Sequence, residues 1–247
     1  MTETKELRGR VHSFQSLGTV DGPGIRYVVF LQGCDLRCGC CHNPDTWDKR
    51  GGKEYTVPEI IERVTRCRSY FGFNGGITVS GGEPLLQADF TRELFRAAKA
   101  EGINTCLDTS GAILDRKAKA LLRECDRVLL DIKYTSEEDY RRYVGCSLAP
   151  VLKFLDYLNE NGIPTTLRQV IIPTKNDTEE NLKALAGIAN DHPVVDKVEL
   201  LPFKKICKVK YDDMRLIFPF GELPSPTASE MNRLKEILSA NMKIENW

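Results

Sequence analysis

The chain has 247 residues, and its 35 Lys and Arg residues balance 35 Asp and Glu residues, so the formal net charge is zero. This balance gives no net field that would attract nucleic acid or an anionic membrane, and no apolar run approaches the roughly 18 residues of a membrane span. The length predicts one domain over residues 1–247, because a chain of this size can bury about 70% of its unfolded surface in one core. Nine cysteines, an odd number in a chain that needs no disulfide bonds to fold, favour reduced thiols in a cytoplasmic protein.

Two short apolar runs open the chain, at residues 11–14 and 25–31. The link between them, residues 18–24, is rich in glycine and contains a proline, a composition that permits tight backbone turns. These features predict an antiparallel pair of strands that leads into the next segment.

Three cysteines with the spacing C-x3-C-x2-C follow the second run: Cys34, Cys38 and Cys41. Three thiolates on one loop at the end of a strand can converge on one soft metal centre. A structural zinc site uses four protein ligands, and a [4Fe-4S] cluster that only transfers electrons is normally held by four cysteines. A cluster held by three cysteines leaves one iron open for a substrate or cosubstrate, so this loop predicts a catalytic cluster.

Three other interpretations of the cysteine loop stay open at this point. Residues 38–42 also spell C-x-x-C-H, the attachment signature of a c-type haem, although residues 1–15 show no apolar export segment. His42 could serve as the fourth ligand of a Cys3His zinc site. The four cysteines at residues 34–41 could also be ordinary buried side chains.

Strands and helices are predicted to alternate along the rest of the chain. Strands are indicated by apolar runs, and helices by apolar residues at helical spacing or by capping signals such as those at 56–59, 136–139 and 227–230. After the strand at 25–31, the predicted strands are 77–79, 104–107, 128–130, 167–172 and 198–201. Six strand–helix units predict a parallel α/β sheet, and six are too few to close an eight-unit barrel. We therefore expect a partial (β/α)6 TIM-like barrel with an N-terminal antiparallel strand and a C-terminal helix.

Polar residues gather where the predicted strands stop. Gly81, Gly82 and Glu83 follow one strand, Asp108 follows the next, and residues 131–133 follow a third. Barrel enzymes place their active sites at the carboxyl ends of strands. Paired glycines also let the backbone approach a ligand closely, and a carboxylate is a natural partner for an ammonium group. The sequence therefore predicts a ligand site at this edge of the sheet.

The cysteine spacing resembles that of the radical S-adenosylmethionine (radical SAM) enzymes, and the wider pattern is similar to the family of pyruvate formate-lyase activating enzymes. The matching stretches are D-G-P-G-I-R at 21–26, C-x3-C-x2-C-H-N-P-D-T-W at 34–47, T-V-S-G-G-E-P at 78–84, L-D-T-S-G at 107–111, L-D-I-K at 130–133 and V-E-L-L-P-F at 198–203. They occur in the family's order and cover nearly the whole chain. Two positions depart from the pattern: Cys40 replaces a usual aromatic residue, and Lys204 replaces a histidine that usually contacts S-adenosylmethionine.

The resemblance implies a reaction. Cys34, Cys38 and Cys41 would hold a [4Fe-4S] cluster that cleaves S-adenosylmethionine reductively, and the 5′-deoxyadenosyl radical would take hydrogen from a glycine of a partner enzyme. The residues implied to line S-adenosylmethionine are Cys40, Cys41, His42, Gly81, Gly82, Glu83, Asp131, Ile132, Lys133 and Arg168, of which Lys133 is also expected to be catalytic.

Two further sites are implied by the same resemblance. Asp108, Thr109 and Asp131 would bind a monovalent cation, Na⁺ or K⁺. Residues that would contact the glycine-bearing peptide are Asp21, Gly22, Pro23, Gly24 and Arg26.

The expected partners are a glycyl radical enzyme, with pyruvate formate-lyase favoured, and flavodoxin or ferredoxin as the reductant; no nucleic-acid or membrane partner is expected. Activases of other glycyl radical enzymes often carry a cysteine-rich insertion between the cluster loop and the G-G-E-P strand. In this chain the corresponding residues, 48–76, contain one cysteine, Cys67. The alternatives are an activase of another glycyl radical enzyme, a radical SAM enzyme acting on a small molecule, and a non-catalytic zinc or iron–sulfur binding module.

Overall fold

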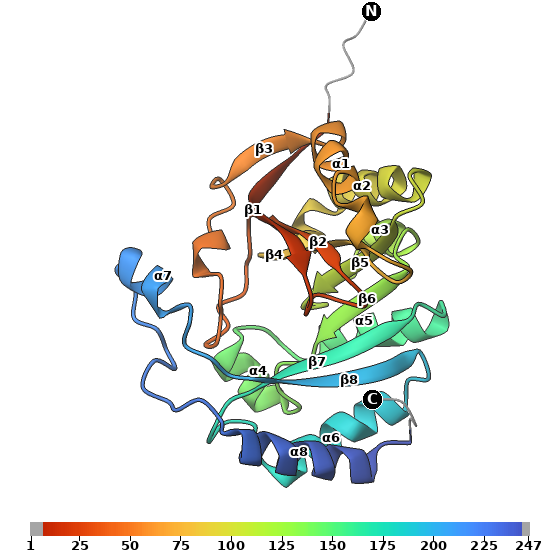
Figure 1. Ribbon diagram of the computed structural model, residues 1–247. Coiled ribbons are helices and arrows are strands. Elements are labelled where there is room, and N and C mark those ends of the chain that lie inside the picture. The colour runs from red at the N-terminus through yellow and green to blue at the C-terminus, as the bar shows by residue number, and fades with distance from the viewer. Residues whose placement is uncertain (1–6, 244–247) are drawn as a thin grey trace, which may run out of the picture. The chain divides into compact units, whose positions relative to one another are not determined.

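The computed structural model describes residues 7–243, whose strands form one eight-stranded sheet in the order β3-β1-β2-β4-β5-β6-β7-β8 (Figure 1). The strands are β1 (Arg8–Gly18), β2 (Arg26–Leu31), β3 (Lys53–Thr56), β4 (Gly76–Gly81), β5 (Asn104–Thr109), β6 (Arg127–Asp131), β7 (Thr165–Ile171) and β8 (Val195–Pro202). The helices are α1 (Val57–Thr65), α2 (Ala88–Ala100), α3 (Arg116–Leu122), α4 (Glu137–Tyr143), α5 (Ala149–Glu160), α6 (Glu179–Asn190), α7 (Lys208–Asp213) and α8 (Ala228–Asn241). Three short 3-10 helices occur at Pro44–Thr46, Arg68–Tyr70 and Pro84–Gln87.

The strand order confirms the predicted fold class. β3 and β8 stand at the two ends of the order, so the sheet is open and not closed into a barrel. β1 pairs with β2 in antiparallel orientation, as predicted, and the pairs β2–β4, β4–β5 and β7–β8 are parallel. The sequence did not predict β3, which pairs with β1 in antiparallel orientation.

The chain separates into two compact units. Unit one comprises Met1–Asp35, Thr46–Thr109 and Leu114–Leu129, and unit two comprises Leu36–Asp45, Ser110–Ile113 and Leu130–Trp247. Within residues 7–243, no helix combines the length and the apolar character that crossing a membrane requires.

The core of unit one lies on its parallel strands. Val29 of β2 stands opposite Val79 of β4, and both side chains are fully buried. α1 begins at the predicted capping box: the Thr56 side chain accepts from the Glu59 amide, and the Glu59 carboxylate accepts from the Thr56 amide at 2.7 Å. In this unit, β2, β4 and the start of α1 therefore form where the sequence pattern predicted them.

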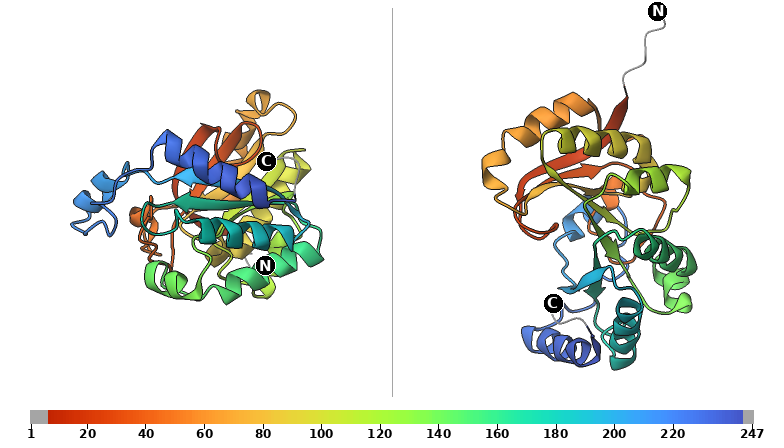
Figure 2. Two further views of the ribbon diagram at one scale, coloured as in Figure 1. Left: turned by 90° about the horizontal axis from the view of Figure 1, so that it is seen from below. Right: turned by 90° about the vertical axis from the view of Figure 1, so that its right-hand side faces the viewer.

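Unit two has its core around β7, β8 and the helices that follow them. Leu167 of β7 stands opposite Val198 of β8, and both are buried. α8 begins at the second predicted capping box, Thr227 with Glu230, and lies beside α6 (Figure 2). One side of α8 buries Leu234 and other apolar residues, which explains why this helix packs on the unit.

Candidate active site

The G-G-E-P stretch lies against the start of the cysteine loop in unit one. The Gly82 amide donates to the Leu31 carbonyl at 2.9 Å, and the Glu83 amide donates to the Gly33 carbonyl at 2.8 Å. A Cβ atom at Gly82 would lie 2.1 Å from the Gly33 oxygen, so only glycine permits this approach. The stretch is therefore fixed one residue away from Cys34.

Glu83 is a buried carboxylate with a defined orientation. Only 3% of the residue is exposed, and its Oε1 accepts from the Thr109 hydroxyl at 2.6 Å and from the Leu85 amide at 3.1 Å. The carboxylate of Asp108, the residue before Thr109, accepts a hydrogen bond from the Ser80 hydroxyl at 2.7 Å. Unit one therefore gathers three of the predicted site residues, Glu83, Asp108 and Thr109, where β4 and β5 end.

Arg26 is fully buried beneath the glycine-rich loop that precedes it. Its guanidinium donates to the Thr78 hydroxyl at 2.9 Å, the Ile77 carbonyl at 2.6 Å and the Asn104 side chain at 2.9 Å. The Thr78 hydroxyl in turn donates to the Asp21 carbonyl at 2.7 Å. Arg26 thus supports the loop from within unit one, and the peptide contact expected of residues 21–24 and 26 stays a prediction.

The second part of the cysteine loop, residues 36–45, folds onto unit two. The amides of Arg37 and Gly39 donate to the carbonyls at the end of α4, at 3.1 and 2.8 Å. A Cβ atom at Gly39 would lie 2.6 Å from the Phe220 ring, so the loop packs closely on that ring. The Cys41 amide donates to the Cys38 carbonyl at 3.0 Å, which closes the turn between these two cysteines.

The donor set fits an iron–sulfur cluster with three cysteine ligands. Cys34, Cys38 and Cys41 are reduced and partly exposed, whereas Cys40 is reduced and buried. Burial raises the pKa of Cys40 to about 11, which disfavours its thiolate form. Across residues 7–243, no three His, Cys, Asp or Glu side chains are arranged to hold a single metal ion.

His42 contacts the backbone of Lys204, the residue at the position where the resembled family usually has a histidine. Its Nε2 atom lies 3.1 Å from the Lys204 carbonyl, and because a carbonyl only accepts, Nε2 carries the proton. Burial lowers the pKa of His42, which favours the neutral ring. The ring is therefore held in one tautomer.

Side chains of α7 make hydrogen bonds to the second part of the cysteine loop within unit two. The Tyr211 hydroxyl donates to the Cys41 carbonyl at 3.2 Å. The Lys210 ammonium donates to Asn43 at 2.8 Å and to Asp45 at 3.0 Å. These contacts could not be predicted, because nothing in the local sequence pattern around residues 205–226 identifies a partner in the loop.

The D-I-K stretch at the end of β6 carries a half-buried ion pair. The Lys133 ammonium donates to the Asp131 carboxylate at 2.7 Å. Burial opposes both charges, yet the positive charges of Lys133 and Arg168 lower the pKa of Asp131, and Asp131 raises the pKa of Lys133. The Ile132 amide donates to the Arg168 carbonyl at 2.9 Å. Unit two therefore brings the predicted residues Asp131, Ile132, Lys133 and Arg168 together.

Two residues that the sequence did not single out hold the backbone of this stretch. The Tyr140 hydroxyl accepts from the Lys133 amide and donates to the Asp131 carbonyl, both at 3.3 Å. The Asn176 side chain donates to the Lys133 carbonyl at 3.2 Å. Both are positioning residues for the ion pair.

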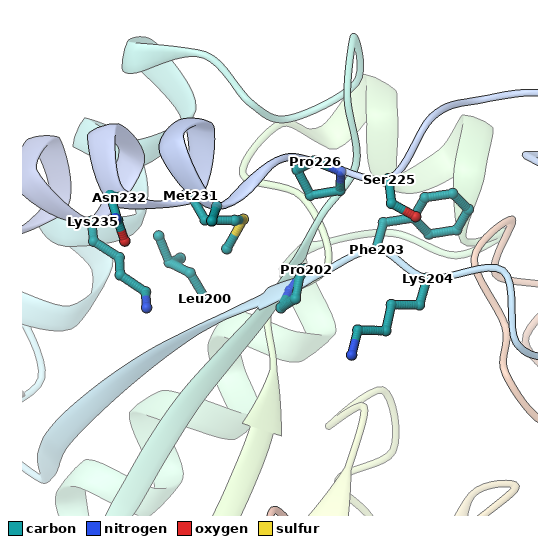
Figure 3. A pocket seen from close by; sticks show the side chains of 10 residues that line it. Leu200, Pro202, Phe203, Lys204, Ser225, Pro226, Met231, Asn232 and Lys235 are labelled. Atoms are coloured by element: carbon teal, nitrogen blue, oxygen red, sulfur yellow. The ribbon is translucent and has the colours of Figure 1, made fainter.

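A separate cavity of about 340 Å³ lies between β8 and the start of α8 (Figure 3). Leu200 and Met231 face each other across it, and the side chains of Lys204 and Lys235 supply its positive charge (Figure 3). The described residues that line this cavity do not include Asp131 or Lys133. It is therefore a feature of unit two apart from the ion pair.

Comparison with known proteins decides the family. Residues 28–186 match the model of the radical SAM superfamily. The chain is 42% identical over 233 residues to pyruvate formate-lyase 1-activating enzyme of Escherichia coli (strain K12), covering 93% of this chain and 95% of that protein. It is 40% identical to pyruvate formate-lyase-activating enzyme of Clostridium pasteurianum, covering 94% and 98%. The chain belongs to the pyruvate formate-lyase activating enzyme family, within the radical SAM superfamily.

Solved structures agree with this family at the level of the fold. A domain of pyruvate-formate lyase-activating enzyme from Bacteroides vulgatus matches with a TM-score of 0.57 and 22% identity, covering 68% of this chain and 94% of that chain. SuiB of Streptococcus suis, solved bound to precursor peptide SuiA, matches with a TM-score of 0.69 and 16% identity, covering 86% of this chain and 44% of that one. Membership of the radical SAM superfamily implies a [4Fe-4S] cluster and S-adenosylmethionine as cofactors.

Proposed function

We propose that this chain is a radical SAM activase that forms a glycyl radical on pyruvate formate-lyase. The observation that carries the proposal is the contact of the G-G-E-P stretch with the start of the cysteine loop. The Glu83 amide bonds to the carbonyl of Gly33, next to the first cysteine. A carboxylate suited to an ammonium group and a cluster ligand are thus neighbours within one unit.

Each part of the site has a role in this proposal. When bound, the cluster would supply one electron to the sulfonium of S-adenosylmethionine, whose C5′–S bond would break to give methionine and a 5′-deoxyadenosyl radical. Cys34, Cys38 and Cys41 would hold the cluster as thiolates. Glu83, held by Thr109, would accept a hydrogen bond from the amino group of the methionine part.

Unit two would supply the other polar contacts to the cosubstrate. The Lys133–Asp131 pair keeps both groups charged at neutral pH, so it offers fixed charges to the carboxylate and hydroxyl groups of S-adenosylmethionine. Cys40, His42, Ile132 and Arg168 would complete the lining with Gly81 and Gly82.

The proposal also includes a cation site, a peptide contact, a reductant and a cellular location. A monovalent cation would bind at Asp108, Thr109 and Asp131, and residues 21–24 would contact the glycine-bearing peptide with Arg26 supporting them. Flavodoxin or ferredoxin would supply the electron, the protein would act in the cytoplasm, and residues 1–247 would function as one radical SAM domain.

The test is a radical assay with the reconstituted, chemically reduced protein. Incubated anaerobically with S-adenosylmethionine and pyruvate formate-lyase, it should give the electron paramagnetic resonance signal of a glycyl radical, and the Cys38→Ala variant should give none. A signal on another glycyl radical enzyme alone would reassign the partner. Zinc without iron in anaerobically purified protein would reject the enzymatic function.

A further inference from the structure

We propose that the exposed side of the segment 204–217 is the docking surface for the reductant, an acidic one-electron carrier protein. We call this surface the α7 face and define it by Lys205, Ile206, Val209, Arg215 and Ile217. The inference rests on the proposed function, because a radical SAM activase must receive an electron from a partner.

The α7 face exposes apolar side chains at unusual density. Ile206 is 73% exposed, Val209 60% and Ile217 91%. Single exposed apolar residues are common on protein surfaces, whereas several in one short segment indicate an interaction site. This group lies within twelve consecutive residues, and α7 stands apart from α6 and α8 in unit two (Figure 1).

The exposure does not come from an unfolded segment. The opposite side of the same residues is packed, since Cys207, Tyr211 and Phe218 are buried. The Tyr211 ring stacks on the Phe218 ring with the centroids 4.6 Å apart. The segment therefore has one side committed to unit two and one side offered to a partner.

Charge selects an acidic partner. Residues 204–217 contain five cationic and two anionic side chains, a net charge of +3 in a chain whose total is zero. Lys208 is paired with Asp212 at 2.8 Å, and Lys210 with Asp45 at 3.0 Å. Lys205 and Arg215 are exposed beside the apolar residues and are free to steer an acidic protein.

The buried side of the same helix leads to the cluster loop. The Tyr211 hydroxyl bonds to the Cys41 carbonyl at 3.2 Å, so one side chain joins the α7 face to the backbone of a cluster ligand. A carrier docked here would sit on the segment whose buried side bonds to the cysteine loop. The step is the transfer of one electron: the reduced carrier is oxidised, the oxidised cluster is reduced, and no bond or proton is exchanged.

The chemistry of the surface favours a carrier over the glycyl radical enzyme. Redox partners bind through small, transient interfaces that depend on charge for encounter. A substrate protein must instead deliver a peptide to the radical, and the residues predicted to contact that peptide, 21–24, belong to unit one. The α7 face combines a small apolar group with net positive charge, which fits the first kind of partner.

The experiment compares two electron sources in the reconstituted full chain. An apolar variant, Ile206→Ser with Ile217→Ser, and a charge variant, Lys205→Glu with Arg215→Glu, are matched to a control in unit one, Phe73→Ser with Arg123→Glu, whose side chains are also exposed. The rate of S-adenosylmethionine cleavage is measured with reduced flavodoxin and, separately, with dithionite.

We expect the flavodoxin-driven rate to fall about tenfold in each α7-face variant at low salt, while the dithionite-driven rate stays within about twofold of wild type. The control should match wild type with both electron sources. The wild-type flavodoxin rate should also fall as salt rises, and the charge variant should lose this dependence.

Three results would overturn the inference. Unchanged flavodoxin rates in both variants would show that the carrier docks elsewhere. Normal cleavage with either electron source, but impaired radical formation on pyruvate formate-lyase, would assign the α7 face to that enzyme. Failure of the wild type to cleave S-adenosylmethionine even with dithionite would reject the proposed function itself, and the inference with it.

Discussion

At Gly82, one missing side chain decides how closely two segments approach. Because a Cβ atom would lie 2.1 Å from the Gly33 oxygen, Gly82→Ala must displace backbone, and we expect it to lose about 1–3 kcal/mol of unfolding free energy. Gly187→Ala is the control, since its Cβ meets nothing within 4 Å and alanine favours the helix by up to about 1 kcal/mol. Urea unfolding measures both, and equal stability of the two variants would contradict the steric argument.

Arg26 shows how a charged residue becomes part of a core. Arg26→Met keeps the apolar stem but removes the guanidinium, leaving carbonyls such as that of Ile77 buried without their donor. We expect a loss of about 2–4 kcal/mol in unfolding free energy, measured by urea denaturation. The exposed Arg123→Met should change it by no more than about 0.5 kcal/mol. A small effect at Arg26 would mean that water replaces its bonds.

Sequence motifs identify positions where only one residue type can do the job. They do not identify residues whose role depends on a partner far away in the sequence. Gly82 and Glu83 stand out in the sequence because close backbone approach favours glycine and an ammonium ligand favours a carboxylate, and their contact with a ligand stays a prediction. Tyr140 and Tyr211 do not stand out, since a tyrosine in a helix is equally suited to packing, and only the tertiary fold brings each hydroxyl to a carbonyl.

At the scale of the element, the capping box of α8 makes the stability of the fold depend on pH. The Thr227 amide donates to Glu230 and lowers the pKa of that carboxylate. A lowered pKa means that the charged form stabilises the fold above the unfolded pKa, and this contribution is lost as pH falls through the folded pKa. Thr227→Ala should cost about 1 kcal/mol at neutral pH.

The pH dependence is tested with Glu230→Gln in urea unfolding of the apoprotein between pH 7 and pH 3. The variant should be less stable than wild type at neutral pH, and the difference should shrink as the wild-type carboxylate is protonated. Glu236→Gln, also exposed on α8, serves as the control. A difference that is constant with pH would exclude the cap as its source.

Elements were predictable where their signals are local. The capping boxes of α1 and α8 and the apolar strands β4 and β6 are encoded by adjacent residues. β3 was missed because its residues, Lys-Glu-Tyr-Thr, have no apolar run, and its pairing with β1 makes it a strand. α7 has six residues and buries only Tyr211, too little for a helical period to show.

At the scale of the whole molecule, the cysteine loop passes from one unit to the other. Cys34 belongs to unit one, whereas Cys38 and Cys41 belong to unit two. A cluster held by the three thiolates would stabilise the folded cysteine loop by mass action. Removing the cluster by iron chelation should therefore raise amide hydrogen exchange in residues 34–45.

Anaerobic hydrogen exchange with mass spectrometry measures this stabilisation in the loaded and chelated proteins. Cys34→Ser should give the chelated pattern in the loop, because losing one ligand weakens the cluster. Cys67→Ser, a change in unit one away from the loop, should keep the loaded pattern. If chelation left exchange in the loop unchanged, or if the two serine variants behaved alike, the loop would not hold a cluster through these three thiolates.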